Sequence, residues 1–373
     1  MINNNFLSVI YIYMVKTKRN KKIKKNKTIK KNKTTNIVVD SKFESGNIKL
    51  LTIKNGVINL EIENEPYSKS TKNKYQNWFY FKVKNILHKK LKFIIHNIRN
   101  FDNSWKGFNV CYSYDNKTWK RTSTKLSNNK LIWNFISKKT SVYFAYYPPY
   151  TFSKSKSLFK NAKVIGKTKN KNRLLMKTFG NGPKNIWLIS GQHPGETISS
   201  WILEGFYKRM KKKRETLYKK YTFYIIPNAN PDGNELGHWY VNSKGINLNT
   251  DWYKNKSNET NAIKKQIDKF GFHLVFDLHG DEACKKHFLV ELKNKHPLFD
   301  TINKKMNKKN KHFQLKDHYE FDPEQISRAT SLDNYTMGIT VEGSMKHPLF
   351  KHKTIQDEAL FIGKNIADTL SEL

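Results

Sequence analysis

Residues 185–205, NIWLISGQHPGETISSWILEG, decide the fold of the C-terminal part of this chain. The first six are apolar and β-prone, and the apolar residues from Ser199 to Met210 have helical spacing. A strand that passes through a turn into a helix is typical of α/β proteins, which hold their chemistry at the carboxyl ends of strands. The turn carries His193 and Glu196, and an imidazole and a carboxylate so spaced can bind one zinc ion. Such pairs are also common on helix surfaces, so a metal site needs a further ligand.

A third ligand is predicted beside another strand. Residues 273–282 read HLVFDLHGDE, in which 273–278 is a short apolar strand and His279 follows its end. Asp277 or Asp281 is expected to orient the His279 ring by accepting from its second nitrogen. Two histidines and one glutamate leave a fourth zinc position for water, which is the hydrolytic arrangement. An ordinary loop histidine is the alternative interpretation.

The proton chemistry is assigned to Glu342. In residues 335–346, YTMGITVEGSMK, the β-prone run 338–341 ends in this carboxylate. A carboxylate at the end of an apolar strand costs free energy unless it has a partner or a catalytic role. We therefore interpret Glu342 as the general base. A surface glutamate at a strand end is the alternative.

The N-terminal part has a different pattern. Short β-prone runs follow one another between residues 37 and 150, and Asn55-Gly56 between two of them is a hairpin signal. This spacing without helical periodicity predicts an antiparallel β-sandwich. We interpret its aromatic run at 78–81 as core rather than as a carbohydrate platform.

The junction between the two parts is predicted from Pro148-Pro149 and the Lys-Ser-rich stretch 153–157. Beyond it, strand-like and helix-like segments alternate, which predicts a mixed α/β sheet with helices on both faces. The expected domains are a disordered basic tail at 1–36, a β-sandwich at 37–152 and an α/β domain at 153–373.

With these residues in place, the chain resembles the M14 zinc carboxypeptidases, in particular the cytosolic carboxypeptidase type. The likeness covers roughly residues 39–370, and its motifs stand in the family's order. In the C-terminal part they are GQHPGET (191–197), NPDG (230–233), GINLNTDW (245–252), DLHGDE (277–282) and TVEGSMK (340–346). In the N-terminal part they are WFYFKV (78–83) and VYFAYYPPY (142–150). The resemblance implies a zinc carboxypeptidase domain after a β-sandwich, with Zn²⁺ on His193, Glu196 and His279 and with Glu342 as catalytic base.

Two positions depart from the family pattern. The family has an arginine after NPDG that polarises the scissile carbonyl, and Tyr240 stands there in this chain. The family also has an Asn-Arg pair that grips the substrate's C-terminal carboxylate, and the pair here is Asn249-Thr250. Loss of one oxyanion donor costs on the order of 10²–10³ in rate, and a hydroxyl does not reproduce the fork of a guanidinium. Asn249, Thr250 and Tyr240 are the expected substrate-binding residues, with Tyr240 a weaker donor.

Three explanations of these losses are open. Lys244 or Arg328 supplies the charge, the substrate has changed, or the chain is a zinc-binding relative with little activity. Tyr319 or Tyr335 is a candidate for the mobile phenol of the family. We expect a zinc metallocarboxypeptidase that removes C-terminal residues, acidic ones such as glutamate, from peptide or protein tails without a small-molecule cofactor. The alternatives are a catalytically weakened M14-like zinc protein that binds acidic tails, and a hydrolase of peptidoglycan or other amides.

Positive charge dominates the composition. Lys and Arg number 70 against 30 Asp and Glu, a net charge of +40. Codon usage of an AT-rich genome explains the excess of lysine, yet a positive field still attracts acidic substrates. Residues 16–33 hold eleven Lys or Arg and no acid, and we interpret them as a solvated tail. A nuclear-localisation or nucleic-acid-binding arm is the alternative.

No membrane association is predicted. The apolar stretch 6–15 is too short to span a bilayer, and it precedes the basic run, which reverses the order of a signal peptide. The two cysteines, Cys111 and Cys284, form no disulfide framework, which fits a reducing compartment. We expect a cytoplasmic protein, with nuclear entry through the basic run as an alternative. Cys284 is expected to be a small buried residue rather than a ligand.

Overall fold

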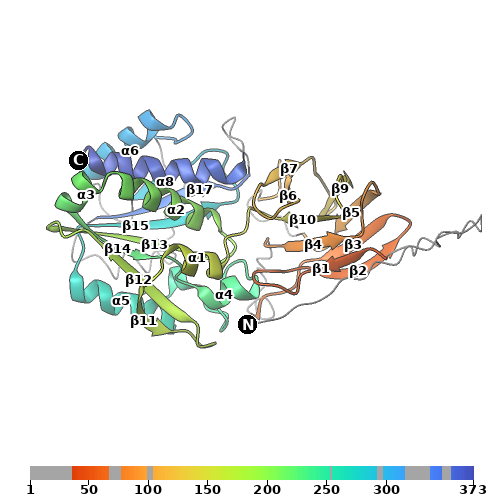
Figure 1. Cartoon of the computed structure of the whole chain (residues 1–373), viewed down its shortest axis with the longest axis horizontal. Coiled ribbons are helices and arrows are strands. Elements are labelled where there is room, and N and C mark those ends of the chain that lie inside the picture. Colours follow the sequence, from red (N-terminus) through yellow and green to blue (C-terminus); the bar gives the residue numbers. More distant parts are fainter. Residues whose placement is uncertain are drawn as a thin grey trace, which may run out of the picture. The chain divides into compact units, whose positions relative to one another are not determined.

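The computed structural model describes residues 36–66, 77–98, 104–252, 254–291, 297–315, 337–346 and 354–373. Residues Ile37–Leu373 form one compact unit, which holds all the helices and strands given below (Figure 1). The predicted tail at 1–36 lies outside the described residues except for Asn36.

Two five-stranded sheets make up the N-terminal part. The first has the order β1-β4-β10-β6-β7, with bounds Val38–Asp40, Tyr80–Lys84, Ser141–Ala145, Val110–Ser113 and Lys120–Thr122. The second has the order β2-β3-β5-β9-β8, with bounds Lys49–Lys54, Val57–Glu61, Lys90–Ile95, Lys130–Ile136 and Lys125–Ser127. All pairings in them are antiparallel except that of β3 with β5. The β-sandwich prediction is confirmed, with one parallel pair in it.

The predicted hairpin at Asn55-Gly56 is also confirmed. These two residues join β2 to β3 and have φ values of 50° and 75°. A two-residue hairpin needs this left-handed backbone, which asparagine and glycine adopt most readily.

Aromatic side chains fill the space between the two sheets. Phe144 of β10 lies 4.9 Å from Phe93 of β5 and 5.5 Å from Trp133 of β9, measured between ring centroids. The run 78–81 is buried throughout, so its interpretation as core holds.

A mixed seven-stranded sheet organises the C-terminal part. Its order is β11-β12-β14-β13-β15-β17-β16, with bounds Lys163–Lys167, Arg173–Phe179, Tyr221–Ile226, Lys184–Ser190, Leu274–Asp281, Met337–Ser344 and Phe288–Glu291. The four central strands β14, β13, β15 and β17 are parallel, and the pairings toward both edges are antiparallel. Parallel central strands bring several carboxyl ends to one edge, where a site can form.

Helices cover both faces of this sheet (Figure 1). α2 (Ile198–Lys212) and α8 (Ile355–Ser371) pack on the face to which Leu188 and Leu278 belong. α5 (Asn258–Phe270) packs on the opposite face, against Trp187 and Val275. The further helices are α1 (Phe152–Leu158), α3 (Arg214–Lys220), α4 (Pro231–Leu236), α6 (Pro297–Lys309) and the 3₁₀ turn η2 (Leu248–Thr250). Within the described ranges, none of the helices has the length and apolarity to cross a bilayer.

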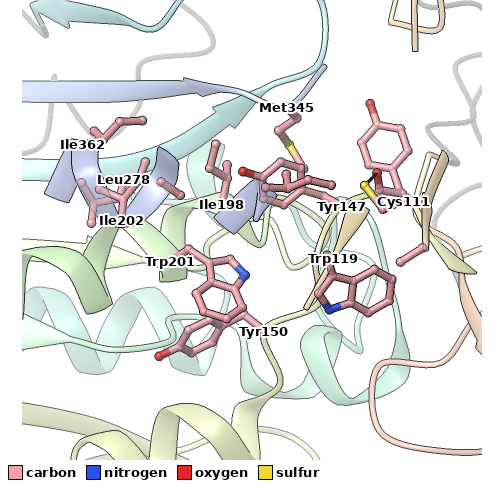
Figure 2. Close-up of a cluster of buried hydrophobic side chains, with 14 of the residues drawn as sticks. Cys111, Trp119, Tyr147, Tyr150, Ile198, Trp201, Ile202, Leu278, Met345 and Ile362 are labelled. Atoms are coloured by element: carbon pink, nitrogen blue, oxygen red, sulfur yellow. Dashed lines mark hydrogen bonds between the residues drawn. The ribbon is translucent and has the colours of Figure 1, made fainter. Parts of the chain in front are cut away.

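The core continues from the N-terminal sheets into the C-terminal part. Figure 2 shows Cys111 of β6 and Trp119, which directly precedes β7, in one cluster with Ile198 and Trp201 of α2. The side chains of Thr197 and Trp201 both donate to the carbonyl of Pro148 at 3.0 Å. The start of α2 is thus fixed by the segment at the predicted junction, whose exact domain boundary stays a prediction.

Two predicted strand ends are wrong by a few residues. β15 continues to Asp281 and β17 to Ser344, so His279 and Glu342 lie within strands. The reason is that the two strands pair with each other along all eight residues of each. The polar side chains at their ends did not stop the pairing, because the backbone hydrogen bonds do not depend on side-chain type.

Candidate metal centre

The turn after β13 depends on two glycines. Gly191 has a φ of 76°, a conformation that side-chain-bearing residues adopt at a cost. The N–H of Gly195 donates to the carbonyl of Trp239 at 3.0 Å, and a Cβ on Gly195 would lie 2.3 Å from the Trp239 ring. The hydroxyl of Ser199 donates to the carbonyl of Glu196 at 2.7 Å. The turn is therefore packed tightly against the segment that carries Trp239, and its end is tied to the start of α2.

His193, Glu196 and His279 converge on one point. Their ligand atoms all lie within 4.8 Å of one another, and all three side chains are buried. Nδ1 of His193 is 2.7 Å from Oε1 of Glu196, and Nδ1 of His279 is 2.9 Å from Oε2. In the part of the chain that the structure describes, no other group of His, Cys, Asp and Glu side chains has this geometry. Their roles as ligands stay predictions.

Each imidazole has a partner on its outer nitrogen. Nε2 of His193 lies 3.0 Å from Oδ1 of Asn247, and Nε2 of His279 lies 2.9 Å from Oδ2 of Asp277. An amide oxygen only accepts, so Nε2 of His193 carries the hydrogen. Nε2 of His279 also lies 3.2 Å from Nε2 of Gln192, and the shorter contact to the negative carboxylate of Asp277 favours a hydrogen on this Nε2 as well. Each Nδ1 then presents a lone pair toward Glu196, which is how outer partners prepare histidines for a metal.

Asp277 is itself held in place. Nε2 of Gln192 donates to Oδ1 of Asp277 at 2.6 Å, and Nε1 of Trp252 donates to Oε1 of Gln192 at 2.7 Å. Asp281 instead accepts an N–H of the following turn at 2.8 Å. Of the two carboxylates predicted to orient His279, the geometry favours Asp277.

The donor set fits zinc. Two Nδ1 lone pairs and the Glu196 carboxylate face one point, and a proton or a cation between them removes their repulsion. Burial raises the pKa of Glu196, but the two imidazoles outweigh it and lower that pKa. Burial lowers the pKa of His279, but Glu196 outweighs it and raises that pKa. Two histidines and a carboxylate are the protein ligands of open, catalytic zinc sites.

Glu342 lies beside these ligands. It is the register partner of His279 on the adjacent parallel strand, so both side chains project from the same face of the sheet. Burial raises the pKa of Glu342 well above its ordinary value, His279 opposes this and Glu196 adds to it. The residue is half-buried, and a divalent cation nearby favours its ionised form.

Tyr240 lies against a predicted ligand. Its ring stacks on that of His193 with the centroids 4.1 Å apart and 19° between the planes. The contact restrains the imidazole, and it brings no positive charge to the position where the family has arginine.

Asn249 and Thr250 form part of η2, beside Asn247. The N–H of Asn249 donates to Oδ1 of Asn247 at 2.9 Å, and the hydroxyl of Thr250 donates to the Asn247 carbonyl at 3.3 Å. The Thr250 hydroxyl thus donates its hydrogen to the backbone of its own turn. Lys244 is exposed.

The other candidates give no further support. Arg328, Tyr319 and Tyr335 lie outside the described residues. Cys284 is half-buried and does not belong to the convergent group.

Sequence reasoning missed three residues of this region. Gln192 and Asn247 lie inside the quoted motifs, and their polar side chains close to His193 and Asn249 were the available signal. Glu65 lies far away in the N-terminal part, and nothing local in the sequence marks it. Its carboxylate accepts from the N–H of Tyr240 at 3.1 Å.

Comparison with known families gives two matches. The family described as the cytosolic carboxypeptidase N-terminal domain matches residues 39–147. The M14 family described as zinc carboxypeptidase matches residues 151–328. The two matches follow one another along the chain as the two structural parts do.

Individual proteins resemble the chain over different lengths. An uncharacterized protein of Zymomonas mobilis is 29% identical over 315 residues, which cover 78% of this chain and 81% of that protein. Cytosolic carboxypeptidase 6 of Caenorhabditis elegans is 29% identical over 255 residues, 58% of this chain and 54% of that protein. The chain thus spans about half the length of the nematode relative. The crystal structure of a metallo-carboxypeptidase from Burkholderia cenocepacia has the same fold, with a TM-score of 0.82 at 21% identity, over 90% of this chain and 99% of that one.

Proposed function

Because the chain belongs to the M14 zinc carboxypeptidases, cytosolic carboxypeptidase type, we propose that it removes C-terminal residues from peptides or proteins. Zn²⁺ is the family's cofactor. The observation that carries the proposal is the convergence of His193, Glu196 and His279 with Glu342 in register beside them. That arrangement would supply three ligands and a base, which is the set that zinc-assisted hydrolysis of an amide uses.

The residues divide the chemistry between them. Zinc held by the three ligands would supply a Lewis acid that lowers the pKa of water and polarises a carbonyl. Glu342 takes the proton of the attacking water and returns it to the departing amine, so that the amine leaves uncharged. Asn247 and Asp277 keep the two imidazoles in the tautomer that presents Nδ1.

The substrate's C-terminus is proposed to lie near η2 and Tyr240. The amide of Asn249 donates to the terminal carboxylate, and Thr250 joins it when its hydroxyl turns from the Asn247 carbonyl. The phenol of Tyr240 donates to the oxygen on which charge develops, as a weaker substitute for a guanidinium. The net charge of +40 favours acidic terminal residues such as glutamate, and tails rich in them.

One observation favours a second candidate. Tyr240 and Thr250 stand where the family has arginines, and the Thr250 hydroxyl bonds within its own turn. A catalytically weakened zinc protein that binds acidic tails would have this combination. The cytoplasm is the proposed location for either function, supported by relatives named cytosolic.

Zinc-loaded protein assayed on peptides that end in Glu, Lys or Phe tests the proposal. We expect turnover with the Glu peptide fastest, and loss of turnover in Glu342→Gln. Binding of the Glu peptide without release of free glutamate would support the second candidate. Absence of both binding and turnover would contradict the two together.

A further inference from the structure

The carboxylate of Glu65 reaches from the N-terminal part to the edge of the metal centre. The residue lies just after β3 and is 4% exposed. The backbone before it is fixed, because Asn97 exchanges two hydrogen bonds with Ile62, of 2.9 and 2.8 Å. Asn47 accepts from the N–H of Glu63 at 2.9 Å. The backbone from which the Glu65 side chain projects is therefore held in place by these hydrogen bonds.

Three consecutive N–H groups donate to this carboxylate. Those of Trp239, Tyr240 and Val241 lie 2.5, 3.1 and 3.1 Å from its oxygens, and that of Tyr240 is also 3.2 Å from the second oxygen. Successive backbone N–H groups that point inward form a concave anion site. Here the anion is a side chain, and it fixes the direction of the segment that carries Tyr240.

The segment held by Glu65 contacts the metal-binding turn twice. The carbonyl of Trp239 accepts from the N–H of Gly195 at 3.0 Å, and the Trp239 ring leaves no space for a Cβ there. The ring of Tyr240 stacks on His193 at 4.1 Å. A shift of this backbone would move the surface against which His193 rests.

A second group of contacts holds the residues just before this segment. Nδ2 of Asn47 donates to the carbonyl of Gly237 at 2.8 Å, and the N–H of Ser45 donates to the carbonyl of Glu235 at 3.0 Å. Gly237 has a φ of 69°, and a Cβ on it would lie 2.6 Å from the carbonyl oxygen of Gly46. The N-terminal part thus forms hydrogen bonds with the backbone of Glu235, Gly237 and residues 239–241.

We propose that Glu65 is a positioning residue, which acts through the backbone of Trp239–Val241 and the Tyr240 ring to hold His193 in its metal-binding orientation. The inference rests on the proposed function, since it assigns the N-terminal part a role in the zinc centre. Glu65 touches neither metal nor substrate in this role. Loss of an outer partner of a ligand commonly weakens metal binding by about 10–100-fold.

The test compares Glu65→Ala and Glu65→Gln with Glu63→Gln in the full chain at pH 8. Glu63 is an exposed glutamate two residues away, so its variant is the matched control. Zinc affinity is measured by competition with a chromogenic chelator, and amide hydrogen exchange over residues 239–241 is measured without zinc. We expect amide exchange over 239–241 to be faster in both Glu65 variants. Zinc affinity should be about tenfold weaker in Glu65→Ala and should fall less in Glu65→Gln. Neither quantity should change in Glu63→Gln.

Two results would overturn the inference. One is unchanged exchange at 239–241, and the other is faster exchange with zinc affinity within twofold of the parent. If Glu65→Ala does not fold, the near-isosteric Glu65→Gln decides: the inference then requires faster exchange at 239–241 and zinc affinity more than twofold weaker than in the parent. Turnover enters neither readout, so a chain that binds zinc but cleaves no peptide would refute the proposed function and leave this inference standing.

Discussion

His279 and Glu342 are register partners on the adjacent parallel strands β15 and β17. The proposed metal ligand and the proposed base are thus set by the same pairing of backbones. Their separation cannot change without breaking ladder hydrogen bonds on both strands, and this rigidity suits a base that must meet one water molecule.

Replacing Glu342 with Gln should therefore separate binding from catalysis. The amide keeps the size of the side chain but cannot accept the proton, so kcat should fall about 10²–10⁴-fold. Zinc affinity should change little, because Glu342 is not among the convergent ligands. Steady-state kinetics and a chelator competition measure the two quantities, and equal loss of both would assign Glu342 to the metal instead.

Asp277→Asn is expected to weaken zinc binding about 10–100-fold, because the amide can turn an N–H toward Nε2 of His279 and lose the acceptor. Asp268→Asn, on the exposed side of α5, is the matched control. Calorimetric titration of the zinc-free proteins compares the two. An affinity that is the same in both variants would show that the Asp277 contact does not orient His279.

Tyr240→Arg should raise kcat/KM, by up to about 10²-fold if the guanidinium reaches the developing oxyanion. Tyr240→Phe keeps the ring on His193 and removes only the hydroxyl, so it isolates the proposed weak donor. We expect a fall of a few-fold in the Phe variant. If neither variant alters kcat/KM on the Glu peptide, Tyr240 has no part in substrate chemistry.

The strands and helices that carry the proposed site residues could be predicted from the sequence. The residues at which those elements end were predicted less well. The alternation around 185–210 predicted β13 and α2 because apolar periodicity reports which face is buried. The extension of β15 through His279 could not be read in this way, since it depends on pairing with a strand some sixty residues away. The role of Glu65 could not be predicted for the same reason, because its partners are backbone N–H groups, which every residue type except proline supplies.

Stability should depend on pH through Glu65. Burial raises the pKa of its carboxyl from 4.5 to about 7, although three backbone N–H groups oppose the shift. Between these values the folded chain keeps a proton that the unfolded chain has released, so the free energy of unfolding falls as the pH rises. The shift corresponds to a loss on the order of 3 kcal/mol, complete above the folded-state pKa.

Urea unfolding of zinc-free protein at about pH 5 and pH 8 measures this effect. The parent should lose stability relative to Glu65→Gln between the two conditions, while Glu63→Gln should follow the parent. A gap between parent and Glu65→Gln that is constant, or that widens in favour of the parent as the pH rises, would be inconsistent with a buried carboxyl of raised pKa.

The most direct test of the metal centre is zinc X-ray absorption on protein loaded with one equivalent of the ion. We predict two imidazole nitrogens and carboxylate oxygen in the first shell at about 2.0–2.2 Å. One imidazole should disappear from that shell in His279→Ala, with a matching loss of affinity. Failure to bind a stoichiometric ion, or an identical spectrum in His279→Ala, would contradict the account.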